Sequence, residues 1–219
     1  MPLLEAAGHR VFAPTLTGLA ERAVELTPQV GLSTHVEDVA GLLEAEGLRD
    51  VTLVGHSYAG AVITGVADRC PGRIAQLVYL DAFLPRHGES VMDMEPPDSR
   101  QAFLEIAREQ GGGWKIPPQQ AFLDRWGLTD PGDRGWVWAR LTAQPLLTCT
   151  EPLDAPDAAA GQLPRAFIDL TTPKNRALDP STGRAREEGL EMLEIATGHD
   201  AMVTEPQRLA GMLAGIAER

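Results

Sequence analysis

Long apolar runs and a secretory leader are both missing from this chain of 219 residues. Nowhere do eighteen apolar residues follow one another, and the opening MPLLEAAGHR has neither a basic start before an apolar run nor a small-residue cleavage site. A membrane-spanning helix needs about 20 apolar residues, and a secretory signal needs that layout. The sequence therefore predicts no membrane partner and a cytoplasmic protein.

Positive charge and cysteine are also scarce. The chain has 19 Lys and Arg against 31 Asp and Glu, a formal net charge of -12, and its only lysines are Lys115 and Lys174. Nucleic acids are bound through clustered basic side chains, so nucleic acid is excluded as a partner. Cys70 and Cys149, the only cysteines, are interpreted as small buried apolar residues rather than as a disulfide.

What the sequence does contain is an alternation of short apolar runs with helical patterns. The expected strands are 9–13, 51–54, 74–80, 165–171 and 192–196. The expected helices are 33–48, with Thr34 and Glu37 as a capping box, 59–68, and the closing PQRLAGMLAGIAE. Such alternation predicts one α/β domain, 1–219, with a mainly parallel sheet flanked by helices.

The middle of the chain breaks this alternation. Between 85 and 164 the pattern changes to helical pieces interrupted by Pro and Gly, and all four tryptophans lie there. We interpret this stretch as a helical cap on a core formed by 1–84 and 165–219. Its aromatic side chains are candidates for the lining of a substrate pocket. They are Trp114, Trp126, Trp136 and Trp138, together with Phe103 and Phe122.

A candidate nucleophile follows the second expected strand. The segment Gly55-His56-Ser57-Tyr58-Ala59 has the strand, small residue, serine, small residue, helix layout of a nucleophile elbow, except that Ala59 replaces the usual second glycine and Gly60 follows. Small residues are needed there because neighbouring backbones nearly touch at this strained turn. A capping serine in a tight turn is the alternative reading of the five residues alone.

A serine hydroxyl becomes a nucleophile when an imidazole accepts its proton, so a histidine is expected later in the chain. His199 lies in TGHDAMVTEP, after the last expected strand and before the closing helix. His9, His35 and His87 have no comparable position, and His56 is interpreted as a packing residue. Ser57 and His199 are therefore the expected nucleophile and base.

Three blocks of this sequence resemble one family. LVGHSYAGAVITGVADR, LVYLDAFLP and GHDAMVTEPQRLA are similar, in this order, to bacterial α/β-hydrolase esterases related to plant methylesterases and hydroxynitrile lyases. The resemblance implies an eight-stranded, mainly parallel sheet, a helical cap, no metal and no cofactor. It also implies Ser57 and His199 as members of a catalytic triad.

The acid of the triad is less direct to assign. The position usual for the fold reads LTTPKNRALDP, where Asn175 carries no charge and Asp179 lies twenty residues before His199. Asp81, at the end of the strand after the nucleophile, is the better candidate, with Asp179 next. A structural carboxylate that accepts backbone N–H bonds is the alternative role for Asp81.

One oxyanion donor is expected to be the backbone N–H of Tyr58, the residue after the nucleophile. The loop that supplies the second donor in the resembling family has no counterpart here. We therefore expect that N-terminal strands are missing and that the sequence begins at an internal methionine of a longer product.

The predicted function is a serine esterase that cleaves a small, mostly apolar carboxylic ester. Two alternatives remain at this point. A carbon-carbon lyase of the hydroxynitrile type uses the same serine and histidine, and a lysine in the pocket would favour it. A non-catalytic module that binds a small ligand would explain the missing second donor. The sequence leaves open the natural ester and whether the chain self-associates.

Overall fold

The computed structural model describes residues 1–219. Its centre is a four-stranded sheet in the order β1-β2-β5-β6, in which every neighbouring pair is parallel. Parallel strands are joined by crossovers and covered on both faces, which is why the central strand β2 is an almost continuous, mostly buried apolar run. The strands are β1 (Val51–His56), β2 (Ile74–Leu80), β5 (Arg165–Leu170) and β6 (Glu191–Ile195).

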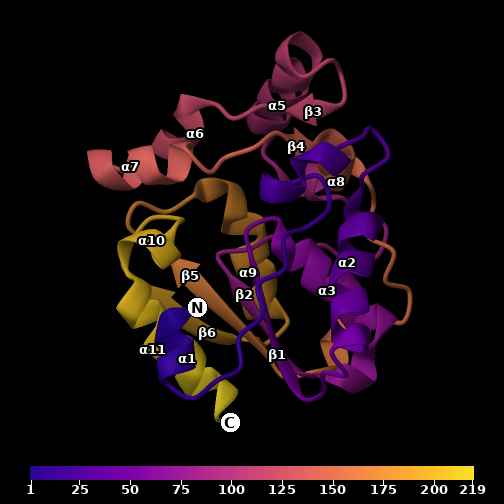
Figure 1. The fold of residues 1–219 in the computed structure, drawn as a ribbon, viewed down its shortest axis with the longest axis vertical. Helices are drawn as coiled ribbons and strands as arrows, with labels where there is room; N and C mark the ends of the chain where they lie inside the picture. The colour runs from indigo at the N-terminus through magenta and orange to yellow at the C-terminus, as the bar shows by residue number, and fades with distance from the viewer.

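Helices cover both faces of this sheet (Figure 1). One group consists of α2 (Leu32–Ala45), α3 (Ala59–Arg69) and α9 (Asp179–Glu187), and the opposite group of α1 (Pro2–Ala6) and α11 (Pro206–Ala217). The short α10 (Ala201–Thr204) precedes α11. None of the helices combines the length and the apolar character that crossing a membrane requires. Short 3₁₀ helices cover Ala20–Glu25, Pro71–Arg73, Ala159–Gln162 and Arg176–Leu178.

The core consists of two apolar clusters, one on each face of the sheet. Alternate residues of β2 separate them: Leu77 and Tyr79 belong to a cluster of 23 buried residues under α2, α3 and α9, whereas Val78 and Leu80 belong to a cluster of nine under α11. This alternation is the period of two that a strand imposes on its side chains. The sheet is therefore held from both sides, and the ends of its strands are fixed in place.

One expectation about the N-terminal part of the sheet is wrong, because residues 9–13 form no strand. The sheet has four strands, fewer than the eight that the resemblance implies and in line with the expected lack of N-terminal strands. A strand exists only where its backbone groups pair with a neighbour. Residues 9–13 have no such partner, and Phe12 is 39% exposed. The strand β1 pairs only with β2, so it is an edge of the sheet.

The first long helix also begins differently from the prediction. Its N-cap is Gly31 rather than Thr34, and the capping contact runs from the Gly31 N–H to Thr34 Oγ1 at 3.2 Å. Glu37 takes no part in the cap and instead pairs with Arg69 of α3 at 3.0 Å. Of the two predicted capping residues only Thr34 takes part, and it occupies the third helical position rather than the cap.

Most of the segment 85–164, which we call the cap segment, lies beyond the carboxyl ends of the strands, at the top of Figure 1, and its last part returns along α3 to the start of β5. It has little packing of its own, because its apolar cluster comprises only Leu123, Leu128 and Val137. Its elements are α4 (Val91–Met94), α5 (Pro97–Gln110), β3 (Lys115–Ile116), α6 (Gln120–Arg125), α7 (Pro131–Trp138), β4 (Gln144–Pro145) and α8 (Leu146–Thr150).

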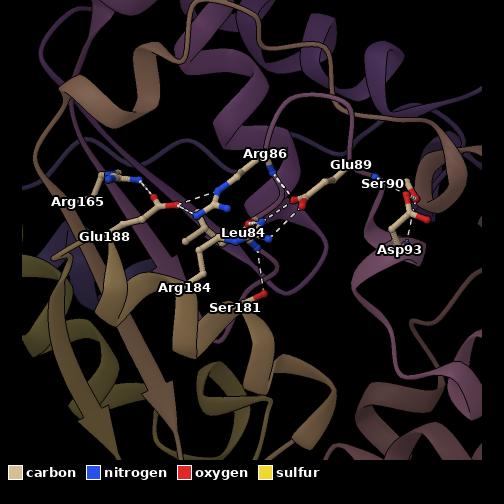
Figure 2. Close-up of polar contacts among 9 residues, drawn as sticks. All are labelled: Leu84, Arg86, Glu89, Ser90, Asp93, Arg165, Ser181, Arg184 and Glu188. Carbon is tan, nitrogen blue, oxygen red and sulfur yellow. Dashed lines mark hydrogen bonds and ion pairs between the residues drawn. The ribbon is translucent and has the colours of Figure 1, made fainter.

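Figure 2 shows how the start of the cap segment is fastened to the core. Arg184 of α9 donates to the carbonyl oxygen of Leu84 at 2.6 Å and to both carboxylate oxygens of Glu89, at 2.5 and 3.1 Å. Ser181, one turn earlier in α9, accepts the Leu84 N–H at 3.1 Å. The chain therefore leaves the sheet at a fixed place, close to the end of β2.

Candidate active site

Ser57 lies in a tight turn between β1 and α3, with a positive φ of 53°. The turn leaves no room for side chains on either side, because a Cβ on Gly55 would lie 2.5 Å from the Ala59 carbonyl oxygen and one on Gly60 would lie 2.1 Å from that of Phe83. The positive φ costs energy for a serine, so the surrounding packing must impose it. Gly60 thus provides the close approach that the departure at Ala59 had put in doubt.

His199 lies between the serine and a carboxylate. Its Nε2 is 2.9 Å from Ser57 Oγ, and its Nδ1 is 2.6 Å from Asp81 Oδ2. Both partners of the second contact are buried, with 2% and 0% of their side chains exposed. A carboxylate accepts, so Nδ1 carries the proton and Nε2 is free to accept the proton of the Ser57 hydroxyl.

Asp81 follows β2 directly and has a positive φ of 40°. Its backbone N–H donates to the Ile168 carbonyl oxygen of the neighbouring strand β5 at 2.8 Å. Its second carboxylate oxygen, Oδ1, has no hydrogen-bond partner within the protein. The side chain is therefore turned toward His199 by the backbone that continues the sheet's pairing.

The residues in and after β5, near the position usual for the acid, lie elsewhere. Asp179 has 53% of its side chain exposed and pairs with Lys174 at 3.5 Å. Asp169 also pairs with Lys174, at 3.0 Å. Asn175 is buried, but its Oδ1 accepts the Ala177 N–H at 3.3 Å. None of the three contacts His199.

Burial governs the protonation of the pair. It lowers the pKa of His199 to about 3, with the positive charge of Arg125 acting in the same direction. It raises the pKa of Asp81 to about 7, an effect that the charge of Asp169 reinforces and that of His56 opposes. Desolvation disfavours the charged form of either group. The imidazole is therefore neutral, which is the form that accepts a proton.

The backbone N–H of Tyr58, at the start of α3, has no backbone acceptor. It adjoins Ser57 at the N-terminal end of a helix, where the helix dipole favours negative charge. The side chain of Tyr58 is fixed by His35, a residue to which sequence reasoning gave no role. His35 Nδ1 is 3.0 Å from Tyr58 Oη, and its Nε2 is 2.9 Å from the Thr17 carbonyl oxygen. Since the carbonyl only accepts, Nε2 carries the proton and Nδ1 accepts from the tyrosine hydroxyl.

His56 also has more contacts than a packing role suggests. Its Nε2 donates to the His199 carbonyl oxygen at 2.9 Å, and the two rings lie 4.4 Å apart between centroids. From the cap segment, the Trp126 carbonyl oxygen accepts the His199 N–H, also at 2.9 Å. The loop of His199 is therefore held from the core side and from the cap side.

A cavity of about 380 Å³ opens at Ser57 and His199, between the core and the cap segment. One of its walls is a row of aromatic rings, in which Phe103 and Phe122 are 5.4 Å apart, Phe122 and Trp126 are 5.9 Å apart, and Trp126 and His199 are 6.3 Å apart. The same wall contains two charged side chains that the sequence analysis missed, Glu95 and Arg125.

Of the four tryptophans predicted to line the pocket, only Trp126 does so. Trp136 and Trp138 are 53% and 39% exposed, and Arg140 stacks on Trp136 at 3.9 Å. Trp114 lies outside the lining, with Lys115 stacked on its ring at 5.0 Å. In the short, irregular helices of the cap segment, the direction of a side chain depends on each loop, so composition alone did not separate the four.

No group of three or more His, Cys, Asp and Glu side chains is placed so that it could hold a metal ion. The polar groups at the end of the cavity are instead a serine, a neutral imidazole and a free backbone N–H. This set fits proton transfer and nucleophilic attack.

The chain is similar over nearly its whole length to known hydrolases. A carbendazim hydrolyzing esterase of Nocardioides sp. (strain SG-4G) is 39% identical over 97% of this chain and 90% of its own length. A pyrethroid hydrolase of Sphingobium wenxiniae is 28% identical over all of this chain and 81% of its own. Among solved structures, an extracellular alpha/beta-hydrolase from a Paenibacillus species superposes with a TM-score of 0.84 at 24% identity, covering 98% of this chain and 90% of its own. The model of the alpha/beta hydrolase family matches residues 1–212, and the chain belongs to that family.

Proposed function

We propose that the protein is a carboxylic ester hydrolase that forms an acyl-enzyme at Ser57. The observation that carries this proposal is the unbroken contact from Ser57 Oγ through His199 to Asp81, at 2.9 and 2.6 Å. The names of the relatives, an esterase at 39% identity and a pyrethroid hydrolase at 28%, support hydrolysis of an ester. The substrate is a small, mostly apolar ester that fits the cavity of about 380 Å³.

The reaction proceeds in two halves. His199 Nε2 accepts the proton of Ser57 Oγ as this oxygen attacks the ester carbonyl carbon, and the Tyr58 N–H donates to the oxyanion that forms. The same imidazole then gives its proton to the alkoxide, the C–O bond breaks and the alcohol leaves. In the second half a water attacks the acyl group, again with His199 as base, and the acid and free Ser57 are released. Asp81 orients the imidazole and stabilises its transient positive charge.

The lyase alternative has less support in this cavity. Neither lysine lines it, since Lys174 is paired with Asp169 and Lys115 is stacked on Trp114. A relative named alpha-hydroxynitrile lyase, from Arabidopsis thaliana, is 41% identical, but over only 38% of this chain. A non-catalytic binding module would not explain why a neutral imidazole with a free lone pair lies 2.9 Å from Ser57 Oγ.

Fluorophosphonate labelling of the purified chain tests the proposal. We expect one label per chain on Ser57 and no label on Ser57→Ala. The unlabelled parent protein should hydrolyse short-chain esters, whereas the labelled protein and Ser57→Ala should not. A well-folded protein that takes no label and hydrolyses no ester would contradict it. Saturable ligand binding without labelling would instead favour the binding module.

The location is part of the same proposal. We place the enzyme in the cytoplasm, where thiols stay reduced, because both Cys70 and Cys149 are free. Fractionation of the source cells followed by activity measurement tests this, and recovery of the activity outside the cytoplasmic fraction would contradict it.

A further inference from the structure

The aromatic wall of the cavity contains a partly buried ion pair, in which the Arg125 side chain is 26% exposed. Glu95, which ends α4, is 7% exposed, and both of its carboxylate oxygens lie near Arg125 Nη2, at 3.0 and 2.9 Å. Both residues line the cavity. When an ion pair is buried, the free-energy cost of removing its hydration roughly cancels the attraction between the charges. Well-packed apolar residues in the same place often give equal stability. Stability alone therefore does not explain why this pair lies in the wall.

Arg125 has hydrogen-bonding capacity left for a ligand. A guanidinium has five N–H donors, and Glu95 takes those of Nη2. Nε is 3.4 Å from Asn175 Oδ1, and Nη1 is 3.4 Å from Ser99 Oγ, so both contacts are long. At least one N–H of Nη1 has no acceptor. The guanidinium also lies 5.3 Å from the centre of the Phe103 ring, which helps to fix its plane.

The pair is also close to the reacting groups. Arg125 is directly followed by Trp126, whose carbonyl oxygen accepts the His199 N–H at 2.9 Å. Phe103, Phe122 and Trp126 form the aromatic row along the same wall. The row of contacting rings leads from Phe103, beside Arg125, through Phe122 and Trp126 to His199, which contacts Ser57.

The charges of the lining decide which polar group fits. Besides the histidines, Tyr58 and Cys149, the ionisable side chains that line the cavity are Arg125, Glu95 and Asp200. Glu95 neutralises Arg125, and Asp200 adds a second carboxyl group. A carboxylate on the substrate would meet this negative balance and lose its hydration, whereas a neutral acceptor needs only one free N–H.

We propose that the Arg125–Glu95 pair determines specificity, by donating a hydrogen bond to an uncharged acceptor on a planar or aromatic arm of the ester and by disfavouring esters that carry a carboxylate. The acceptor is a carbonyl oxygen, an ether oxygen or a ring nitrogen. This inference rests on the proposed ester hydrolysis and narrows its substrate class.

Three methyl benzoates that differ only at the para position test it. Methyl 4-acetylbenzoate offers a neutral acceptor, methyl 4-isopropenylbenzoate has the same shape without one, and monomethyl terephthalate carries a carboxylate. The acetates of the corresponding benzyl alcohols cover the opposite orientation. In the better orientation we expect kcat/KM of the acetyl ester to exceed that of the isopropenyl ester about tenfold, as a hydrogen bond to a charged group allows. Monomethyl terephthalate, which carries the carboxylate, should have the lowest kcat/KM of the three.

Variants separate the pair from the rest of the cavity. Arg125→Met should lower kcat/KM for the acetyl ester about tenfold relative to the isopropenyl ester. Glu95→Gln leaves the arginine uncompensated and should raise kcat/KM for the carboxylate ester about tenfold. Arg134→Met is the matched control, because Arg134 pairs with Asp124 on the cap segment at 2.7 Å but lies outside the cavity. For each ester, the kcat/KM of the variant is divided by that of the parent, so that the intrinsic reactivity of the ester cancels.

A single variant that leaves one charge buried can unfold, so the double variant Glu95→Gln with Arg125→Met is included. Fluorophosphonate labelling of every variant checks that its active site is intact. Loss of the acetyl preference in the double variant supports the inference. Retention of that preference, or a parent enzyme that treats the three esters alike, overturns it.

If Ser57 of the parent takes no label, the proposed function fails but the specificity remains testable. Binding of the same esters to Ser57→Ala, followed by tryptophan fluorescence, should then give the same order. Equal affinities of Ser57→Ala for the three esters would overturn the inference about specificity, whatever the outcome for the proposed function.

Discussion

The sheet core and the cap segment face the same cavity but are packed very differently. The two clusters on the faces of the sheet have 23 and nine buried apolar residues, and the cap segment contributes five members of the larger one, namely Val91, Met94, Leu153, Ala155 and Ala160. The cluster within the cap segment itself has three. The core supplies Ser57, Asp81 and His199 from loops at the carboxyl ends of its strands. The cap segment supplies the aromatic row and the Arg125–Glu95 pair. Under the proposed function, dense packing therefore fixes the groups that react, and a thinly packed layer carries the groups that select the substrate.

This contrast predicts that substitutions in the core remove activity or stability, whereas substitutions in the cap segment change substrate preference. Reacting groups have to be held within a fraction of an ångström, and only packed elements do this. A specificity wall tolerates small movements, since each of its contacts contributes modestly to binding.

The strongest test in the core is Asp81→Asn. We expect turnover to fall about 10⁴-fold with folding intact, because the amide no longer stabilises the imidazolium or selects the required tautomer. Asp179→Asn is the matched control, since Asp179 is half exposed and does not contact His199. Ester hydrolysis and circular dichroism of both variants give the answer. Near-normal turnover in Asp81→Asn would remove the carboxylate from the mechanism.

The next test concerns the turn around the nucleophile. Gly60→Ala should cost about 1 to 3 kcal/mol of unfolding free energy, because its new Cβ would lie 2.1 Å from the Phe83 carbonyl oxygen. Turnover should also fall, since the Phe83 N–H bonds the Ser57 carbonyl oxygen at 3.0 Å and must shift. Gly215→Ala in α11 is the control, because nothing lies within 4 Å of its added Cβ. Urea unfolding that ranks the two variants equally would contradict the close contact.

A buried acid next to His199 gives a test with a pH signature. Burial, aided by the charge of Asp81, raises the pKa of Asp200 from 3.8 to about 6. Below pH 3.8 both the folded and the unfolded state hold the proton, and there is no effect. As the pH rises toward 6 the unfolded state ionises first, so the folded state loses stability, and the loss is complete above 6.

Asp200→Asn should therefore gain about 1 to 3 kcal/mol more over the parent at pH 8 than at pH 4. Unfolding in urea at the two pH values measures this difference. Asp154→Asn serves as the control, because 88% of the Asp154 side chain is exposed and its substitution should have the same small effect at both pH values. A gain for Asp200→Asn that does not depend on pH would mean that Asp200 is not desolvated.

The same contrast explains how much the sequence could predict. The strands at 51–54, 74–80, 165–171 and 192–196 are confirmed within a few residues. The two central strands β2 and β5 are mostly buried, whereas the edge strands β1 and β6 are mostly part-buried or exposed. Ser57 and His199 follow two of these strands directly, so their meeting could be inferred from a parallel sheet. Asp81 follows a third. Residues 9–13 show the limit, because an apolar run becomes a strand only where a neighbour pairs with it.

The cavity wall could not be predicted in the same way. Glu95 and Arg125 are thirty residues apart in a segment of short helices, and no periodic pattern indicates that their side chains meet. His35 lies on the buried face of α2, but its partner Thr17 is in an irregular loop. Contacts between irregular segments depend on loop conformations, which propensity and periodicity do not encode.

The smallest effect is expected for Trp126→Leu in the cap segment. The indole lines the cavity, so its loss should raise KM about tenfold for an aromatic ester, as removal of an aromatic contact suggests. The rate constant kcat should change little, because His199 is held by the Trp126 backbone carbonyl oxygen, which leucine retains. Trp136→Leu is the control, since its side chain is 53% exposed outside the cavity and its replacement should leave KM unchanged. If Trp126→Leu lowered kcat as strongly as KM rose, the cap segment would also be positioning the reacting groups, and the division of labour between the two regions would fail.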